Sequence, residues 1–311
     1  MNETTRSPGA FTMTAFAVAV ILGGANFLAV RFSNRELEPF WGAGLRFSLA
    51  ALLFVGIAVA LRLRWPRGRQ LWLTCLYGVF SFALSYALMY WALVRVTAGM
   101  AAVVLAVVPL VTLLLAAAQR LEPLSRRTVL GSLLALGGIL FATLGQEIML
   151  PLSGLLAMLA AALTIGESVI LGKRVSDNHP AMTNAVGLAA GAPLLLGLSA
   201  LAGETWVLPR QPEVVWSVVY LVTLGSTGLF VLILLVVRRW TASATSYVFV
   251  LFPVVTMLLA AWLANEPITA RGVIGALVVI SGVWFGALAP AARQPAVPPL
   301  GETPALATEV P

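Results

Sequence analysis

Ionisable side chains lie in or beside long apolar segments, where they could carry a proton or hold a charged ligand. Glu167 is a carboxylate well inside such a segment, and Arg46 lies inside another. An ionised side chain at the centre of a bilayer costs about 3 kcal/mol on insertion scales, so both residues are functional candidates. Glu167 is expected to exchange a proton with the cytoplasm; the alternative is that it extends to the interface without a function. Arg46 could bind a substrate carboxylate or extend outward, and a structural or gating role is favoured.

Two further carboxylates mark the ends of apolar segments, since Glu122 and Glu266 each stand directly before a proline. Each lies 13 residues beyond a proline inside its segment. That separation corresponds to about 20 Å of helix, so the carboxylates should reach the membrane surfaces. There they are expected to end their helices or to form alternating gate contacts with Arg126, Arg127 or Arg271.

The two internal prolines, Pro109 and Pro253, are expected near the middles of their helices. Proline lacks a backbone donor and clashes with the carbonyl four residues earlier, which frees the carbonyls of Leu105 and Phe249. A substrate or water could satisfy such a carbonyl, although the proline could also serve only to kink the helix. We assign both prolines to the predicted substrate site.

Polar side chains inside the apolar segments are few, and they are the candidates for a cavity wall. We place Asn26, Ser85, Tyr86 and Tyr247 in that wall, with hydrogen bonding between helices as the alternative. Enzymatic activity is not expected, because the chain has no Walker motif or clustered catalytic set. A lone cysteine and a lone histidine argue against a disulfide framework and a metal site, so no cofactor is expected.

Composition points to a protein of the lipid bilayer. Hydrophobic residues make up 60% of the chain and charged residues 10%, whereas charged residues are about a quarter of a soluble domain. The net charge of +7 comes from cations in short loops between apolar runs, so nucleic acid is not an expected partner. We predict an all-α protein with ten transmembrane helices, which cover 11–30, 39–61, 71–93, 98–118, 127–145, 152–172, 180–201, 214–237, 241–264 and 270–290.

Arginine and lysine positions predict the orientation. With the N-terminus in the cytoplasm, 13 of these residues fall in inner segments and 5 in outer segments. Both termini are therefore expected in the cytoplasm. The expected membrane is the inner membrane of a bacterium.

An internal repeat relates the two halves of the chain. Residues 95–140 align without a gap to 239–284, with 18 of 46 positions identical. Five helices per half is an odd number, so the second half must enter the membrane inverted. The predicted units are a first five-helix repeat over 1–145, a second over 146–290 and a disordered tail over 291–311. Glycines at 131, 138, 275 and 282 are expected to allow close helix packing.

The repeated pattern of small residues, an apolar run with a central proline and a final Glu-Pro resembles the EamA-type members of the drug/metabolite transporter superfamily. GLRFSLAALL at 44–53, which contains Arg46, and LGGANFLAVRFS at 22–33 are similar to motifs of that family, although Gly23 replaces its usual tryptophan. The resemblance implies a 5+5 inverted-repeat bundle with a central cavity that opens to either side.

These features together predict a secondary transporter. Its expected activity is export of a small organic metabolite, an amino acid or a neutral compound, by alternating access, with proton antiport through Glu167. An uncoupled facilitator and a lipid flippase remain the alternatives. The expected partners are the substrate, the bilayer and a proton, and the oligomeric state is left open.

Overall fold

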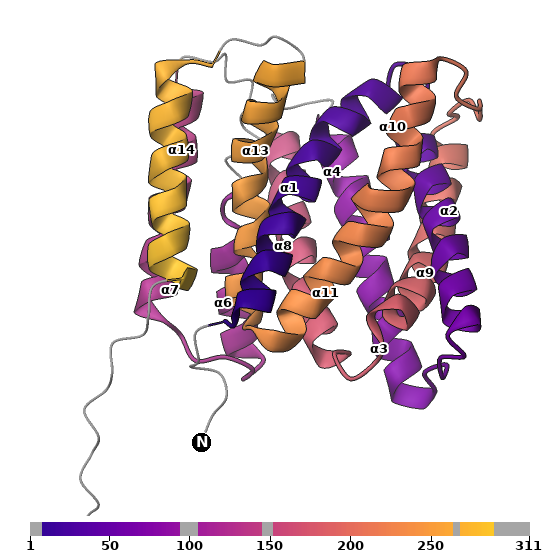
Figure 1. The fold of residues 1–311 in the computed structure, drawn as a ribbon, viewed down its shortest axis with the longest axis horizontal. Coiled ribbons are helices and arrows are strands. Elements are labelled where there is room, and N and C mark those ends of the chain that lie inside the picture. Colours follow the sequence, from indigo (N-terminus) through magenta and orange to yellow (C-terminus); the bar gives the residue numbers. More distant parts are fainter. Residues whose placement is uncertain (1–7, 94–104, 145–151, 264–267, 289–311) are drawn as a thin grey trace, which may run out of the picture.

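The computed structural model describes residues 8–93, 105–144, 152–263 and 268–288, and every regular element in these ranges is helical (Figure 1). Among them are three short π-helical segments, labelled η. The elements are α1 (Ala10–Ser33), α2 (Pro39–Ala60), α3 (Gly68–Gly78), η2 (Val79–Leu84), α4 (Ser85–Leu93), α6 (Val108–Ala118), α7 (Arg126–Thr143), α8 (Leu152–Arg174), α9 (Pro180–Leu201), α10 (Pro212–Val222), η3 (Thr223–Gly228), α11 (Leu229–Arg239), α12 (Ala242–Thr245), α13 (Tyr247–Leu263), α14 (Ala270–Val283) and η4 (Trp284–Leu288).

The described ranges contain nine helices that are long and apolar enough to cross a membrane. They match nine of the ten predicted segments, so the prediction of an all-α, multi-span protein is confirmed. The segment predicted over 98–118 is described only from residue 105, and its helix α6 is shorter. The predicted tail over 291–311 lies outside the described residues.

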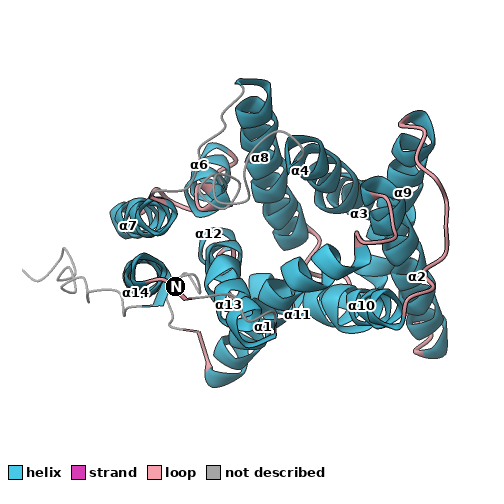
Figure 2. Cartoon of the chain, turned by 90° about the horizontal axis from the view of Figure 1, so that it is seen from above, coloured by secondary structure: helices cyan, strands magenta, loops and turns pink. Residues whose placement is uncertain are grey.

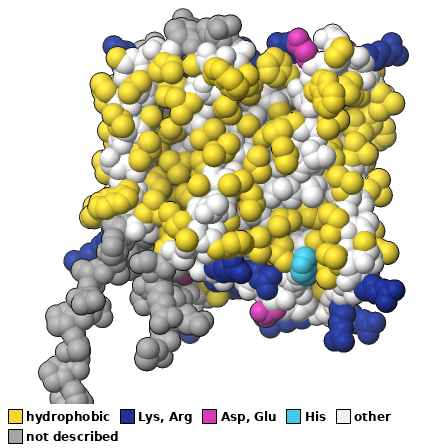
Figure 3. Space-filling model, in the orientation of Figure 1, with side chains coloured by type: hydrophobic (Ala, Val, Ile, Leu, Met, Phe, Trp, Pro, Cys, Tyr) yellow, Lys and Arg dark blue, Asp and Glu magenta, His cyan; other side chains and the backbone are white. Residues whose placement is uncertain are grey.

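Large apolar side chains cover the outside of the bundle. Leu52, Leu201 and Trp262 are 68%, 86% and 77% exposed. Figure 3 shows hydrophobic side chains over the middle of one face, while Lys and Arg lie at its two ends. Exposed apolar surface of this extent is not stable in water, so lipid must cover the sides of the bundle.

Helices α7 and α14 pack together through glycines, as the sequence predicts. A Cβ added at Gly138 would lie 2.8 Å from the carbonyl oxygen of Gly275, and one added at Gly282 would lie 2.7 Å from that of Gly131. Both distances are too short for a side chain, so the four glycines let the two backbones touch. The pair stands at one side of the bundle in Figures 1 and 2.

Two of the π-helical segments interrupt long helices at corresponding places. Val79 and Thr223, the first residues of η2 and η3, are 144 residues apart, which is also the spacing of the sequence repeat. The helices that precede them, α3 and α10, begin at Gly68 and Pro212 with the same spacing. Segments of this kind are rare and occur frequently at functional sites.

Candidate substrate cavity

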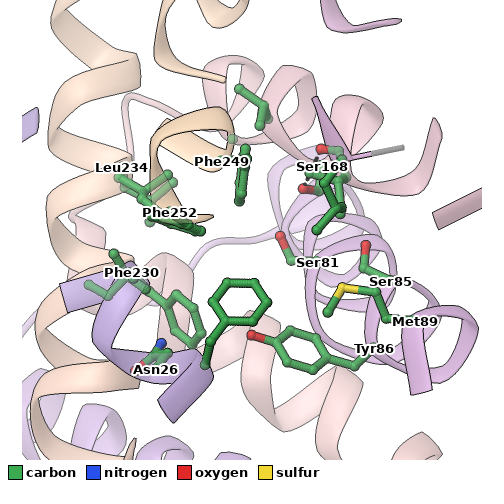
Figure 4. A pocket seen from close by; sticks show the side chains of 18 of the residues that line it. Asn26, Ser81, Ser85, Tyr86, Met89, Ser168, Phe230, Leu234, Phe249 and Phe252 are labelled. Carbon is green, nitrogen blue, oxygen red and sulfur yellow. Dashed lines mark hydrogen bonds between the residues drawn. The ribbon is translucent and has the colours of Figure 1, made fainter. Parts of the chain in front are cut away.

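A cavity of about 150 Å³ lies inside the bundle. It is lined by residues of α1, α2, α3, η2, α4, α8, α11 and α13. Figure 4 shows that its walls differ in chemistry. Hydroxyl groups line one side, and aromatic and aliphatic side chains line the other.

The hydroxyl wall is built by η2, α4 and α8 and includes Ser81, Ser85, Tyr86 and Ser168. The Ser85 hydroxyl donates to the Phe80 carbonyl at 2.6 Å, five residues earlier. That carbonyl lies in η2 and also accepts from the Ser85 backbone N–H, so the side chain adds a second bond where the regular helix is interrupted. In Figure 4 the Ser81 and Tyr86 hydroxyls point toward the open centre.

The apolar wall comes from α11 and α13 and includes Phe230, Leu234, Phe249 and Phe252. Phe249 and Phe252 meet edge to face with ring centroids 5.5 Å apart, a favourable aromatic geometry. Phe249 lies four residues before Pro253 and therefore at the carbonyl that the proline frees. An apolar part of a ligand would pack on this wall.

Asn26 on α1 connects the cavity to η3. Its amide nitrogen donates to the Gly225 carbonyl at 2.8 Å, and the side chain is 7% exposed. Its carbonyl oxygen has no hydrogen-bond partner among the described residues. A Cβ at Gly225 would lie 2.2 Å from that oxygen, so the close approach requires glycine. Asn26 can thus accept one hydrogen bond from a ligand.

Arg46 on α2 also lines the cavity and is 2% exposed. Its Nη2 donates to the Tyr86 hydroxyl at 2.9 Å, and its guanidinium lies 4.4 Å from the centroid of the Phe47 ring. The side chain therefore turns inward against aromatic neighbours, and does not extend outward to the interface.

Three residues assigned to the substrate site lie elsewhere. The Tyr247 hydroxyl donates to the Thr128 carbonyl at 2.9 Å and lies 3.0 Å from the Ser132 hydroxyl, so this ring faces α7 and not the cavity. Pro253 lies inside α13 as predicted, whereas Pro109 occupies the first turn of α6 and not the middle of a helix. Neither proline lines the cavity, but Leu105 and Phe249, four residues before them, do.

Glu167 lies outside the cavity lining. Its carboxylate accepts a hydrogen bond from the Gln119 side chain at 2.6 Å, just beyond the end of α6. The cavity-lining residues of α8 occupy another face of the helix and are Ile165, Ser168, Val169 and Gly172. Its role in proton coupling remains a prediction.

Glu122 joins two parts of the chain that are distant in sequence. Its carboxylate accepts hydrogen bonds from the backbone N–H groups of Ala242 and Ser243 and from the Ser243 hydroxyl, all in α12. The sequence predicted arginine contacts, but these bonds go to a helix N-terminus, where N–H groups attract an anion. Nearby, Lys173 Nζ donates to the carbonyls of Val237 and Trp240 at 2.8 and 2.7 Å. Glu266 lies outside the described residues.

Sequence reasoning missed part of the cavity wall. The missed lining residues include Ser168, Met89 and the three phenylalanines of the apolar wall, Phe230, Phe249 and Phe252. An apolar side chain in a membrane protein gives no sequence signal that tells whether it faces a cavity or lipid. Ser81 lies four residues before Ser85 on one helix face, and this spacing does predict it as a cavity residue. No group of three or more His, Cys, Asp or Glu side chains is placed to hold a metal ion in the part of the chain that the structure describes.

A bundle of membrane-spanning helices around an internal cavity is an architecture typical of membrane transporters. The family model of the "EamA-like transporter family" matches residues 10–144 and again 152–287. The chain belongs to this family.

Curated relatives cover most of the chain. The "Uncharacterized inner membrane transporter YedA" of Escherichia coli is 28% identical, over 84% of this chain and 87% of its own length. The "Probable amino-acid metabolite efflux pump" of Salmonella typhimurium is 29% identical over 86% and 92%. The "Probable terminal-alkyne amino-acid exporter" of Streptantibioticus cattleyicolor is 27% identical over 87% and 91%.

A solved structure titled "Crystal structure of protein" has the same fold, with a TM-score of 0.76. It is 20% identical and covers 90% of this chain and 98% of its own.

Proposed function

We propose that this protein exports a small organic metabolite across a bacterial inner membrane by alternating access. The observation that carries the proposal is the internal cavity, which combines a hydroxyl wall with an aromatic wall inside a bundle of transporter-family helices. Relatives named as exporters of amino acids or their metabolites support the direction and the substrate class.

The proposed architecture is a 5+5 inverted repeat. The family model matches each half once, and the π-helical segments η2 and η3 recur at the spacing of the sequence repeat. Contacts between α7 and the last helix are reciprocal: Arg127 donates to the Phe285 carbonyl at 3.0 Å, and Arg271 donates to the Leu144 carbonyl at 2.9 Å. Two such halves that exchange conformations would expose the cavity to each side in turn.

The proposed orientation places both termini in the cytoplasm. The connections between α2 and α3 and between α8 and α9 lie at one end of the bundle, together with Arg62, Arg64 and Lys173. This end, which also contains the start of α12, is called the basic end. Clusters of cations remain on the cytoplasmic side of membranes, which favours the basic end as the inner one.

Proton antiport through Glu167 is the proposed energy source. Its support is a carboxylate in a transmembrane helix that is held by the neutral side chain of Gln119. An uncoupled facilitator, in which Glu167 only bonds Gln119, is the rival. A lipid flippase would need a lateral opening lined by polar groups, whereas the described cavity has a largely apolar wall.

Untargeted mass spectrometry of the culture medium tests export. Cells that overproduce the protein are compared with cells that carry Glu167→Gln and with cells that lack the protein. A metabolite enriched outside by the wild type supports export and names the substrate. Equal enrichment by the variant would keep export and remove Glu167 as the proton carrier, and no enrichment by a folded, inserted wild type would contradict export.

A further inference from the structure

Arg46 is a buried cation whose hydrogen-bonding capacity is only partly used. Within the described residues its Nε and Nη1 have no hydrogen-bond partner, although the side chain is 2% exposed. Its one hydrogen bond goes to the neutral Tyr86 hydroxyl at 2.9 Å. The group also lines the cavity, so a ligand in the cavity can reach it.

Three of the four described carboxylates at the end of the bundle where α2 begins are held by other groups. Glu204 accepts from the backbone N–H groups of Phe40 and Trp41 at 3.0 and 2.6 Å. Glu36 accepts from backbone N–H groups at the start of α10, and Glu213 pairs with Arg35. Exposed Glu38 precedes α2 without a side-chain cap. Arg46 thus forms no ion pair with any side chain in the described ranges.

The groups that do face Arg46 are aromatic. Its guanidinium lies 4.4 Å from the Phe47 ring centroid and 5.1 Å from that of Tyr86. Aromatic faces attract a cation but supply no hydrogen-bond acceptors for the remaining N–H groups. A buried charge without a counter-ion destabilises a fold, and a bound anion would remove that cost.

We propose that Arg46 binds a carboxylate of the transported molecule, so that the substrates are small organic acids or zwitterions with an apolar remainder. Guanidinium groups bind carboxylates through two parallel N–H bonds. Nη1 has no partner, and Nη2 has a second N–H besides the one that it donates to Tyr86, so the two nitrogens can hold a carboxylate together. The apolar remainder would pack on Phe230, Phe249 and Phe252, which form the apolar wall. The assignment of a transported molecule rests on the proposed export function, whereas carboxylate binding does not.

Matched acids and amides test the proposal on the purified full chain. The probes are 3-phenylpropionate with 3-phenylpropanamide and L-leucine with L-leucinamide, and thermal unfolding is followed as each is titrated. Wild-type protein should bind an acid about 10- to 100-fold more tightly than its amide, because a charged hydrogen-bonded contact is lost in the amide. Arg46→Gln should lose that preference, whereas Arg35→Gln, at an exposed arginine that pairs with Glu213 outside the cavity, should retain it.

The thermal stability of Arg46→Gln without ligand gives a second test, because a recognition role and a purely structural role predict changes of opposite sign. A recognition role predicts that Arg46→Gln without ligand is as stable as the wild type or more stable, because an uncompensated buried charge has been removed. A purely structural role predicts a lower unfolding temperature. A lower unfolding temperature of Arg46→Gln together with an unchanged preference of this variant for acids would overturn the proposal. Equal binding of acids and amides by the wild type, or no binding of either acid, would also overturn it.

Counterflow in liposomes separates this proposal from the proposed function. Acids that bind through Arg46 but do not cross the membrane would remove the export function and keep the site. Acids that are carried equally well by Arg46→Gln would keep the export function and remove the site.

Discussion

At the scale of single residues, carboxylates hold the starts of helices in the opposite half of the chain. Glu122 caps α12, Glu204 caps α2 and Glu36 accepts from N–H groups at the start of α10. An anion at a helix N-terminus satisfies N–H groups that have no partner within the helix. Such bonds are directional yet can be broken, which suits contacts that would open and close in the proposed alternating access.

Glu122→Ala is expected to loosen the start of α12. Loss of the carboxylate should lower the local opening free energy by about 1–2 kcal/mol, as for other helix caps. Hydrogen exchange at the Ala242 and Ser243 amides should therefore accelerate roughly 5- to 30-fold. Glu38→Ala is the matched control, because Glu38 precedes α2 without a side-chain bond to it. Unchanged exchange at α12 would show that the Glu122 bonds do not hold this helix.

Glu167→Gln is expected to uncouple transport from the proton gradient. Glutamine keeps the hydrogen-bonding shape toward Gln119 but cannot release a proton. Gradient-driven accumulation in liposomes should fall to the level seen without a gradient, while exchange of substrate between the two sides continues. Glu213→Gln, which removes an exposed carboxylate of the Arg35 pair, serves as the control. Gradient-driven accumulation by Glu167→Gln at the wild-type level would exclude Glu167 as the proton carrier.

The sequence identified some cavity residues and misplaced others for a physical reason. Asn26, Ser85 and Tyr86 were predicted to line the cavity, and they do. Tyr247 was predicted to join them, but its hydroxyl finds acceptors on α7. A tyrosine in an apolar helix needs a hydrogen-bond partner, and sequence does not tell which neighbouring helix supplies it.

At the scale of elements, helix positions were predictable, because nine apolar runs match nine described spans. The π-helical segments η2 and η3, which interrupt two of these helices, were not predictable. At η2 the Ser85 hydroxyl bonds the Phe80 carbonyl five residues earlier and also the Thr164 hydroxyl on α8, which is distant in sequence. Asn26 makes a comparable bond to the Gly225 carbonyl in η3. These bonds join residues up to 199 positions apart, which a local pattern cannot reveal.

The contact between α7 and α14 gives a sharp test of helix packing. Gly138→Ala should destabilise the protein by about 1–3 kcal/mol, because the new methyl group would overlap backbone atoms of α14. Gly137→Ala at the adjacent position should be neutral or slightly stabilising, since no atom lies within 4 Å of its added Cβ. Thermal unfolding in detergent measures both. Equal effects of the two substitutions would contradict close packing at Gly138.

At the scale of the whole molecule, exposed leucines and tryptophans require a bilayer, and the proposed export function requires a route into the internal cavity. Family membership and the paired elements support one mechanism, in which two inverted halves exchange conformations. In this mechanism the cavity is reached from only one side at any moment, and over time from both.

Cysteine accessibility tests this mechanism most directly and needs no known substrate. Cys75, the only cysteine, is replaced by alanine, and Ser81→Cys places a thiol at the cavity wall. Leu52→Cys, on the lipid-facing surface, is the control that a water-borne reagent should not label.

We expect a membrane-impermeant thiol reagent to label Ser81→Cys from either side of oriented vesicles, and to leave Leu52→Cys unlabelled. Labelling from a single side under all gradients, or from neither side in folded protein, would contradict alternating access.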